Sequence, residues 1–310
     1  LHALLAAVPG AKVLPAFRRG NVVGALQVGV RPGKGGLDTR GALQAAADGK
    51  IECLVLLGAD PLADFPDTDL ARRALAGARR IIAVDTFLTQ SSQRADVVLA
   101  ASAYAEKSGT TTNLEGRVST VARQVTPAGS TRPDWMIATE LALVLGGDLG
   151  YGSVEAVTAD IAAKVAGFES VTAEALAADG NGVLAGVPAA IDPINVVEVD
   201  VRERNAYDFR LVVSRTLYDQ ATGTANSPSL AALPRGSAVH LHPLDLERVG
   251  TTAGTDVKVI GPRSTVVFTA VADETVLRGT AFVPFNNPGP NVGELIDCFA
   301  AVNDVRIENL

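Results

Sequence analysis

The sequence predicts a mixed α/β protein, in which a Rossmann-like parallel sheet is followed by a small C-terminal β-barrel. Short apolar runs alternate with helical stretches in the first half of the chain, and the apolar period changes to two from Phe209 onward. An Ala- and Gly-rich stretch separates the two patterns. The predicted boundaries are therefore 1–147 for the α/β domain, 148–205 for a helical linker and 206–310 for the barrel.

The first half supplies the elements of the sheet. Residues 37–48 show apolar side chains at helical spacing, and the apolar run 51–57 that follows suits a buried strand. Residues 70–77 predict a further helix, and 80–84 and 95–99 predict two more strands. This alternation predicts parallel strands with helices on both faces of the sheet.

Two loops follow the first two strands, at the sheet edge where ligands of parallel sheets bind. They are Gly58-Ala59-Asp60-Pro61 and Asp85-Thr86. Gly58 permits a close backbone approach to a ligand, and the Asp60 carboxylate is able to accept hydrogen bonds from sugar hydroxyls or a base edge. The pattern permits a nucleotide site but does not demand one, and a simple strand-to-helix turn with an Asp cap is the favoured interpretation.

The segment between the two patterns predicts a loop and a helix. Residues 106–117 are polar and rich in Gly and Thr, which indicates a structured loop over the sheet edge, with at most a weak surface pair between Glu115 and Arg117. Asp134 is a plausible N-cap for the helix that follows. The predicted apolar stripe of this helix comprises Ile137, Leu141, Val144 and Leu145.

The last third predicts the barrel. Short strands of period two are separated by turn residues and lie at 209–213, 238–241, 256–260, 265–271 and 280–284. His240 and His242 would face one side of a strand, which a metal could use, but no third ligand accompanies them, so no metal site is expected.

The composition limits the function classes. The chain has 310 residues, 47% hydrophobic and 20% charged, which is enough for two compact domains. Its longest apolar stretches fall short of the roughly 20 residues that span a membrane, so no direct membrane span is expected. A net charge of −7 without a Lys and Arg cluster argues against nucleic acid. Cys53 and Cys298 are far apart and predict buried, inert thiols.

Several motifs occur in a characteristic order along the chain. They are Asn21 with Gly24-Ala25, the Leu56–Pro61 and Glu106–Arg117 segments, Arg215-Thr216-Leu217-Tyr218-Asp219, and His242-Pro243-Leu244-Asp245 followed by Gly254. This order resembles the molybdopterin oxidoreductase superfamily and, within it, the large iron–sulfur subunits of respiratory NADH:quinone oxidoreductases (complex I). The barrel signature departs from the family by Leu246 for Ala and by Thr255 between Gly254 and Asp256.

The resemblance implies a set of site residues. In relatives that bind molybdopterin guanine dinucleotide, the two strand-end loops face one guanosine half, and the segment at Arg215 lies near the pterin. The implied cofactor-binding residues, expected to be vestigial, are Gly58, Asp60, Asp85, Thr86 and Arg215. For Arg215 the alternative is an interdomain clamp that pairs a carboxylate. No catalytic residue is expected.

The resemblance also implies a role. The expected role is that of a scaffold without a redox centre, from which molybdopterin has been lost, in an enzyme that passes electrons from NADH to quinone coupled to proton translocation. Iron–sulfur clusters are expected in an N-terminal part of a longer polypeptide, because two distant cysteines cannot hold one. The expected partners are other peripheral-arm subunits, on the cytoplasmic side of a bacterial plasma membrane. The alternative is a segment of an active molybdopterin-dependent oxidoreductase resembling formate dehydrogenase.

Overall fold

The computed structural model describes residues 19–186 and 203–310, together with residues 7, 8, 10, 17 and 201. The chain divides into two compact units. One unit comprises Leu1–Asp38 with Ala100–Ile194, and the other comprises Thr39–Leu99 with Asn195–Leu310. Residues 187–200 and 202 of the predicted linker lie outside the described residues, and the boundaries predicted at 147 and 205 stay predictions.

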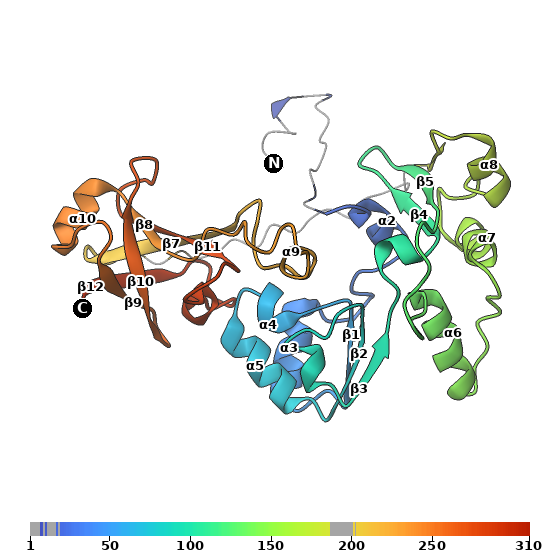
Figure 1. The fold of residues 1–310 in the computed structure, drawn as a ribbon, viewed down its shortest axis with the longest axis horizontal. Helices are drawn as coiled ribbons and strands as arrows, with labels where there is room; N and C mark the ends of the chain where they lie inside the picture. The colour runs from blue at the N-terminus through green and yellow to red at the C-terminus, as the bar shows by residue number, and fades with distance from the viewer. Residues whose placement is uncertain (1–6, 9, 11–16, 18, 187–200, 202) are drawn as a thin grey trace. The chain divides into compact units, whose positions relative to one another are not determined.

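The predicted Rossmann-like parallel sheet is confirmed (Figure 1). β1 (Cys53–Leu57) pairs in parallel with β2 (Arg80–Asp85), and β3 (Val97–Ala100) completes the order β1-β2-β3. α3 (Thr39–Ala47) packs against α5 (Thr68–Gly77). Leu75 of α5 joins the buried cluster of Leu56, Ile81 and Ala83, so α5 covers one face of the sheet.

The other face of this sheet differs from the expectation. Side chains alternate between the faces of a strand, and on β1 Leu56 is buried, whereas Val55 and Leu57 are 57% and 64% exposed. The expected second helical layer is therefore missing over β1 in the described part of the chain. Cys53 is also exposed on this strand, so the prediction of a buried thiol there is wrong, because the thiol lies on the uncovered face.

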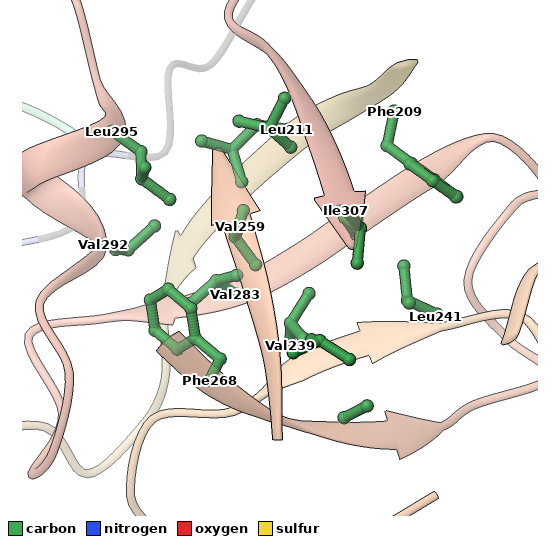
Figure 2. Close-up of a cluster of buried hydrophobic side chains, with 14 of the residues drawn as sticks. Phe209, Leu211, Val239, Leu241, Val259, Phe268, Val283, Val292, Leu295 and Ile307 are labelled. Carbon is green, nitrogen blue, oxygen red and sulfur yellow. The ribbon is translucent and has the colours of Figure 1, made fainter. Parts of the chain in front are cut away.

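The predicted C-terminal barrel is confirmed as a closed six-stranded structure. The strands are β7 (Asp208–Arg215), β8 (Val239–Leu241), β9 (Asp256–Ile260), β10 (Thr265–Ala272), β11 (Thr280–Phe285) and β12 (Asp304–Asn309), in the order β10-β8-β11-β7-β12-β9. Figure 2 shows their inward side chains, among them Phe209, Leu241 and Phe268, as one core. The sixth strand was missed by the sequence prediction although buried Val305 and Ile307 alternate with exposed Arg306.

Short helices connect the barrel strands: α9 (Thr222–Ala225), α10 (Pro243–Val249) and η3 (Val292–Leu295). At the start of α10, Nδ1 of His242 accepts a hydrogen bond from Leu244 N at 3.2 Å. The buried Asp245 accepts one from Gly279 N at 2.6 Å, at the turn before β11. The His-Pro-x-Asp motif therefore starts a helix and anchors a turn. His240 Nδ1 lies 3.3 Å from Asp273 Oδ2.

The first unit contains an antiparallel sheet that the sequence prediction missed. β4 (Gly109–Thr112), β5 (Arg117–Val121) and β6 (Val183–Leu184) follow one another in it. The prediction of a loop at 106–117 is wrong in this respect. β4 lies within this segment and pairs with β5, which begins at its last residue, in a hairpin whose turn is held by Asn113. Its Oδ1 accepts hydrogen bonds from Glu115 N and Arg117 N, both at 2.9 Å. Arg117 Nε lies 4.0 Å from Glu115 Oε2 and Glu115 is exposed, so this pair contributes about 0–1 kcal/mol at most.

The Asn21 motif has a structural explanation in the same unit. Asn21 precedes α2 (Val22–Gln27), and its Oδ1 accepts a hydrogen bond from Thr112 N on β4 at 2.9 Å. A Cβ atom on Gly24 would lie 2.4 Å from that oxygen and 2.7 Å from Thr112 Oγ1. The spacing Asn-x-x-Gly thus lets α2 approach β4 closely.

The remaining helices of this unit are α6 (Asp134–Val144), α7 (Val154–Lys164) and α8 (Ala173–Ala178), with a 3₁₀ turn η2 at Tyr104–Glu106. The prediction that Asp134 is the N-cap of α6 is wrong, because Pro133 occupies that position. The Asp134 carboxylate instead pairs with Lys107 Nζ. No helix among the described residues is long and apolar enough to cross a membrane.

Candidate functional site

The predicted site begins at Gly58, directly after β1. Gly58 adopts φ +56°, in the left-handed region that favours glycine, and its N–H donates to Val84 O of β2 at 2.8 Å. This residue is exposed, and a Cβ atom placed on it would meet nothing within 4 Å. The backbone turn, rather than close approach of neighbouring atoms, therefore accounts for glycine at this position.

Asp60 is buried and has partners within the chain. It precedes α4 (Pro61–Asp64), but its carboxylate does not cap that helix. Its Oδ1 accepts hydrogen bonds from Ser91 N at 3.2 Å and from the Ser91 hydroxyl. Ser91 Oγ in turn accepts from Leu62 N at 3.0 Å. Asp60 thus joins the loop after β1 to the segment before η1 (Ser92–Arg94).

Asp85 and Thr86 form a turn of their own after β2. Oδ1 of Asp85 accepts hydrogen bonds from Thr86 N at 2.7 Å and from Phe87 N at 3.4 Å. Thr86 is exposed, and so are Phe87 and Leu88 beside it. The bonds of Asp60 lead to Ser91 and those of Asp85 to its own turn, so the two carboxylates predicted for one site are engaged separately.

Arg215 is the one basic side chain in the predicted set, and its guanidinium is held between two carboxylates. Its side chain, at the end of β7, is only 16% exposed. Nη1 donates to Asp219 Oδ2 at 3.1 Å and Nη2 pairs with Asp64 Oδ1 at the end of α4. The guanidinium also lies 5.4 Å from the ring centroid of Phe285. Arg215 thus links the barrel to α4.

The sequence prediction missed the two acids that hold Arg215 as its partners. Asp219 lies four residues after Arg215 in the Arg-Thr-Leu-Tyr-Asp motif, so this pair could have been predicted from the motif. Asp64 is 151 residues from Arg215 in the sequence, and no local pattern connects them. Asp64 and Asp219 therefore occupy the Arg215 guanidinium, whereas Asp60 and Asp85 are engaged elsewhere. A guanidinium already paired with two carboxylates does not fit the diphosphate of a dinucleotide, which carries negative charge itself and would compete with both acids.

In a turn of the barrel, by contrast with the paired Arg215, two buried polar side chains lack a partner in the described part of the chain. Ser237 Oγ and Asn286 Nδ2 are buried and have no hydrogen-bond partner among the described residues. The backbone links the two segments, since Ser237 N donates to Pro288 O at 2.8 Å. Asn286 also adopts φ +55°, which is uncommon for a residue with a side chain. Buried donors without a partner are rare, so a ligand or water would be expected to satisfy them.

A second ionic cluster lies between α5 and the barrel. Asp67 is fully buried and accepts hydrogen bonds from Leu70 N at 3.0 Å, Cys298 N at 3.1 Å and Arg263 Nη2 at 3.0 Å. Burial alone would raise the pKa of the Asp67 carboxyl, but these three donors outweigh it and hold the pKa below its usual value. The ionised Asp67 carboxylate therefore serves to hold α5 to the barrel.

Comparison with known families agrees with this architecture. Residues 10–144 match the molybdopterin oxidoreductase family, and residues 209–305 match the molydopterin dinucleotide binding domain. The two matched regions follow one another along the chain, so both parts of the chain are similar to domains of molybdopterin oxidoreductases. The structure is similar to that of acetylene hydratase from Pelobacter acetylenicus, with a TM-score of 0.68 and 14% identity over 87% of this chain and 46% of that one.

The curated relatives differ in their activities. The chain is 30% identical to the NADPH-Fe(3+) oxidoreductase subunit alpha of Geobacter sulfurreducens, over 96% of this chain and 37% of that protein. It is 29% identical to the F420-dependent formate dehydrogenase 1 subunit alpha of Methanococcus maripaludis, over 78% of this chain and 39% of the relative. It is 26% identical to an NADH-quinone oxidoreductase subunit of Rhizobium meliloti, over 82% of this chain and 30% of the relative. The chain thus spans less than half the length of these relatives.

Proposed function

We propose that this chain is a scaffold region of the large iron–sulfur subunit of a bacterial NADH:quinone oxidoreductase. In this role it binds neither molybdopterin nor an iron–sulfur cluster, and electrons from NADH reach quinone through clusters elsewhere in the same polypeptide. The enzyme couples this transfer to proton translocation. Its partners are the other peripheral-arm subunits, on the cytoplasmic side of the plasma membrane.

The observation that carries the proposal is the double pairing of Arg215. A phosphate at this guanidinium would have to displace Asp64 and Asp219, or bind beside both of them. Each displaced carboxylate would lose a charge-assisted hydrogen bond, and such bonds are worth about 1.5–3 kcal/mol. Asp60, engaged by Ser91, adds negative charge to the same loop region. The motifs at Asn21, Leu56–Pro61 and Arg215–Asp219 also favour the large subunit of NADH:quinone oxidoreductase.

A specific observation supports a second candidate. The unpartnered Ser237 Oγ and Asn286 Nδ2, buried among the described residues, are donors that a bound pterin would satisfy. If they do so, the chain is a segment of an active molybdopterin-dependent oxidoreductase resembling formate dehydrogenase. The names of the relatives do not decide between the candidates, because identities of 30%, 29% and 26% belong to proteins of different activity.

The test is a deletion of the gene in the source organism, complemented by the full-length gene. We expect membranes of the deletion strain to lose NADH:quinone reductase activity and the complemented strain to regain it. We also expect an affinity tag on the full-length protein to retain the complex that carries this activity. Normal NADH:quinone activity in the deletion strain, together with loss of formate oxidation, would favour the second candidate.

A further inference from the structure

α6 is an apolar helix that its own unit leaves uncovered. Ile137 is its one buried residue. Of the other members of the predicted stripe, Leu141 is exposed, and Val144 and Leu145 at the end of the helix are 84% and 85% exposed. Leu143, on another side of the helix, is exposed as well. Of the four residues of the predicted stripe, only Ile137 is therefore buried by the described residues.

Both acids and the Thr139 hydroxyl of α6 are already engaged within the unit. Glu140 pairs with Arg132, and Asp134 pairs with Lys107. Thr139 Oγ1 donates to Trp135 O at 2.8 Å, within the helix itself. The side chains that remain available for an outside contact at the C-terminal half are thus apolar on more than one side.

Such a helix requires a particular environment. A helix that is apolar all round is found buried in a core, whereas a surface helix keeps a polar face toward water. Contiguous exposed apolar side chains on a protein mark an interface, and permanent interfaces are more apolar than transient ones. The pairing of both acids of α6 within the unit leaves an apolar surface, which indicates a permanent interface rather than a transient encounter.

We infer that the C-terminal half of α6, from Leu141 to Leu145, packs against an apolar surface carried by the same polypeptide outside residues 1–310, and this surface is the layer that covers it. The relatives supply the reason for this occupant. The chain covers only 37% of the first relative and 39% of the formate dehydrogenase subunit, so a polypeptide of comparable length has ample sequence to provide that layer. The inference goes beyond the proposed function, since it holds whether or not a cofactor is bound.

The experiment is site-specific photo-crosslinking in the full-length protein within its native complex. A benzophenone amino acid replaces Val144, and a matched variant carries it at Glu174, an exposed polar residue of α8. Cells grown on light and heavy nitrogen are mixed before purification, so that peptides joined between two copies carry both isotopes. We expect the Val144 variant to yield peptides of one isotope, from the same polypeptide outside residues 1–310, well above the Glu174 variant.

Four results would overturn the inference: mixed-isotope peptides, which show a second copy; single-isotope peptides from residues 1–310; peptides of another subunit; or a yield no higher than at Glu174. A second measurement guards against a variant that fails to assemble. Val144→Asp should lower the thermal midpoint of the full-length protein by several degrees, because a carboxylate would be buried without a partner. Val125→Asp, at an exposed apolar residue in a loop, should leave the midpoint unchanged. Equal midpoints for both variants would also count against the inference.

Discussion

Two ionic clusters join the helices of the parallel sheet to the barrel, and they are built in opposite ways. In one, the Asp67 carboxylate is surrounded by three donors and is fully buried. In the other, the Arg215 guanidinium lies between Asp64 and Asp219 and keeps some contact with water. The first cluster has no role in the predicted site, whereas the second occupies it. A residue type expected for cofactor binding can therefore serve the same structural purpose as a buried anion elsewhere.

The largest effect is expected for Asp67→Ala. The substitution removes the acceptor of two N–H groups and one carboxylate partner of the Arg263 guanidinium, so the free energy of unfolding should fall by about 3–5 kcal/mol. Urea denaturation followed by circular dichroism measures it. Asp67→Asn, which keeps the shape and removes the charge, is the matched control and should lose less. A loss below about 1 kcal/mol for the alanine variant would show that the cluster does not hold α5 to the barrel.

The same cluster predicts a dependence on pH. Because the pKa of Asp67 is lower in the folded chain, its stabilisation is present above the unfolded pKa of about 3.9 and is lost as the pH falls through the folded pKa. The difference in unfolding free energy between the wild type and Asp67→Asn should therefore be constant at neutral pH and shrink under acid conditions. A difference that grows on acidification would contradict the assigned direction of the pKa shift.

A smaller effect is expected for Arg215→Met. The variant leaves Asp64 and Asp219 without their shared cation, but Asp64 is partly exposed, so we expect a loss of about 2 kcal/mol in unfolding free energy. Arg215→Lys keeps the charge but lacks the planar guanidinium that bonds both acids. Its unfolding free energy should lie between those of the wild type and Arg215→Met. If Arg215→Met unfolds like the wild type, the guanidinium is not a clamp and is free for a ligand.

A loss of about 1 kcal/mol is expected for Ser91→Ala. The hydroxyl donates to Asp60 Oδ1 and accepts from Leu62 N, so its removal leaves buried groups unsatisfied. Thr86→Val, at the exposed residue of the neighbouring loop, should change the unfolding free energy by less than about 0.5 kcal/mol. Both values come from the same urea titration. Equal effects of the two variants would argue that Asp60 does not depend on Ser91.

The two cysteines give the mildest test, because no change in stability is involved. Burial, and then the negative charge of Asp67, raises the pKa of the Cys298 thiol to about 11. Cys53 is exposed on β1. A maleimide at neutral pH should therefore label Cys53 first, as read by mass spectrometry of the intact protein, and Cys53→Ser should remove the fast label. Faster labelling of Cys298 would contradict the packing of the Asp67 cluster.

The strands and the barrel could be predicted from the sequence because their signal is local. The period-two run from Phe209 and the apolar runs before Gly58 and Asp85 each depend on neighbouring residues. The ionic clusters could not be predicted in this way, because their partners are distant in the sequence. Arg263 lies 196 residues from Asp67, and Arg215 lies 151 residues from Asp64. The helix α6 was predicted, but of its predicted apolar stripe only Ile137 is buried among the described residues, because burial depends on what packs against the helix. For the candidate site, the sequence indicated which residues lie at the strand ends, but not that Ser91 and Asp64 engage them.

The central claim is that the side chains of Asp60, Asp85 and Arg215 in the predicted site are satisfied within the chain. The most direct measurement is the content of iron, molybdenum, tungsten and pterin in the full-length native protein purified from membranes, per mole of polypeptide. The account predicts iron without molybdenum, tungsten or pterin. Near-stoichiometric pterin with molybdenum or tungsten would contradict it, and would make the strand-end loops and Arg215 contacts of a bound cofactor.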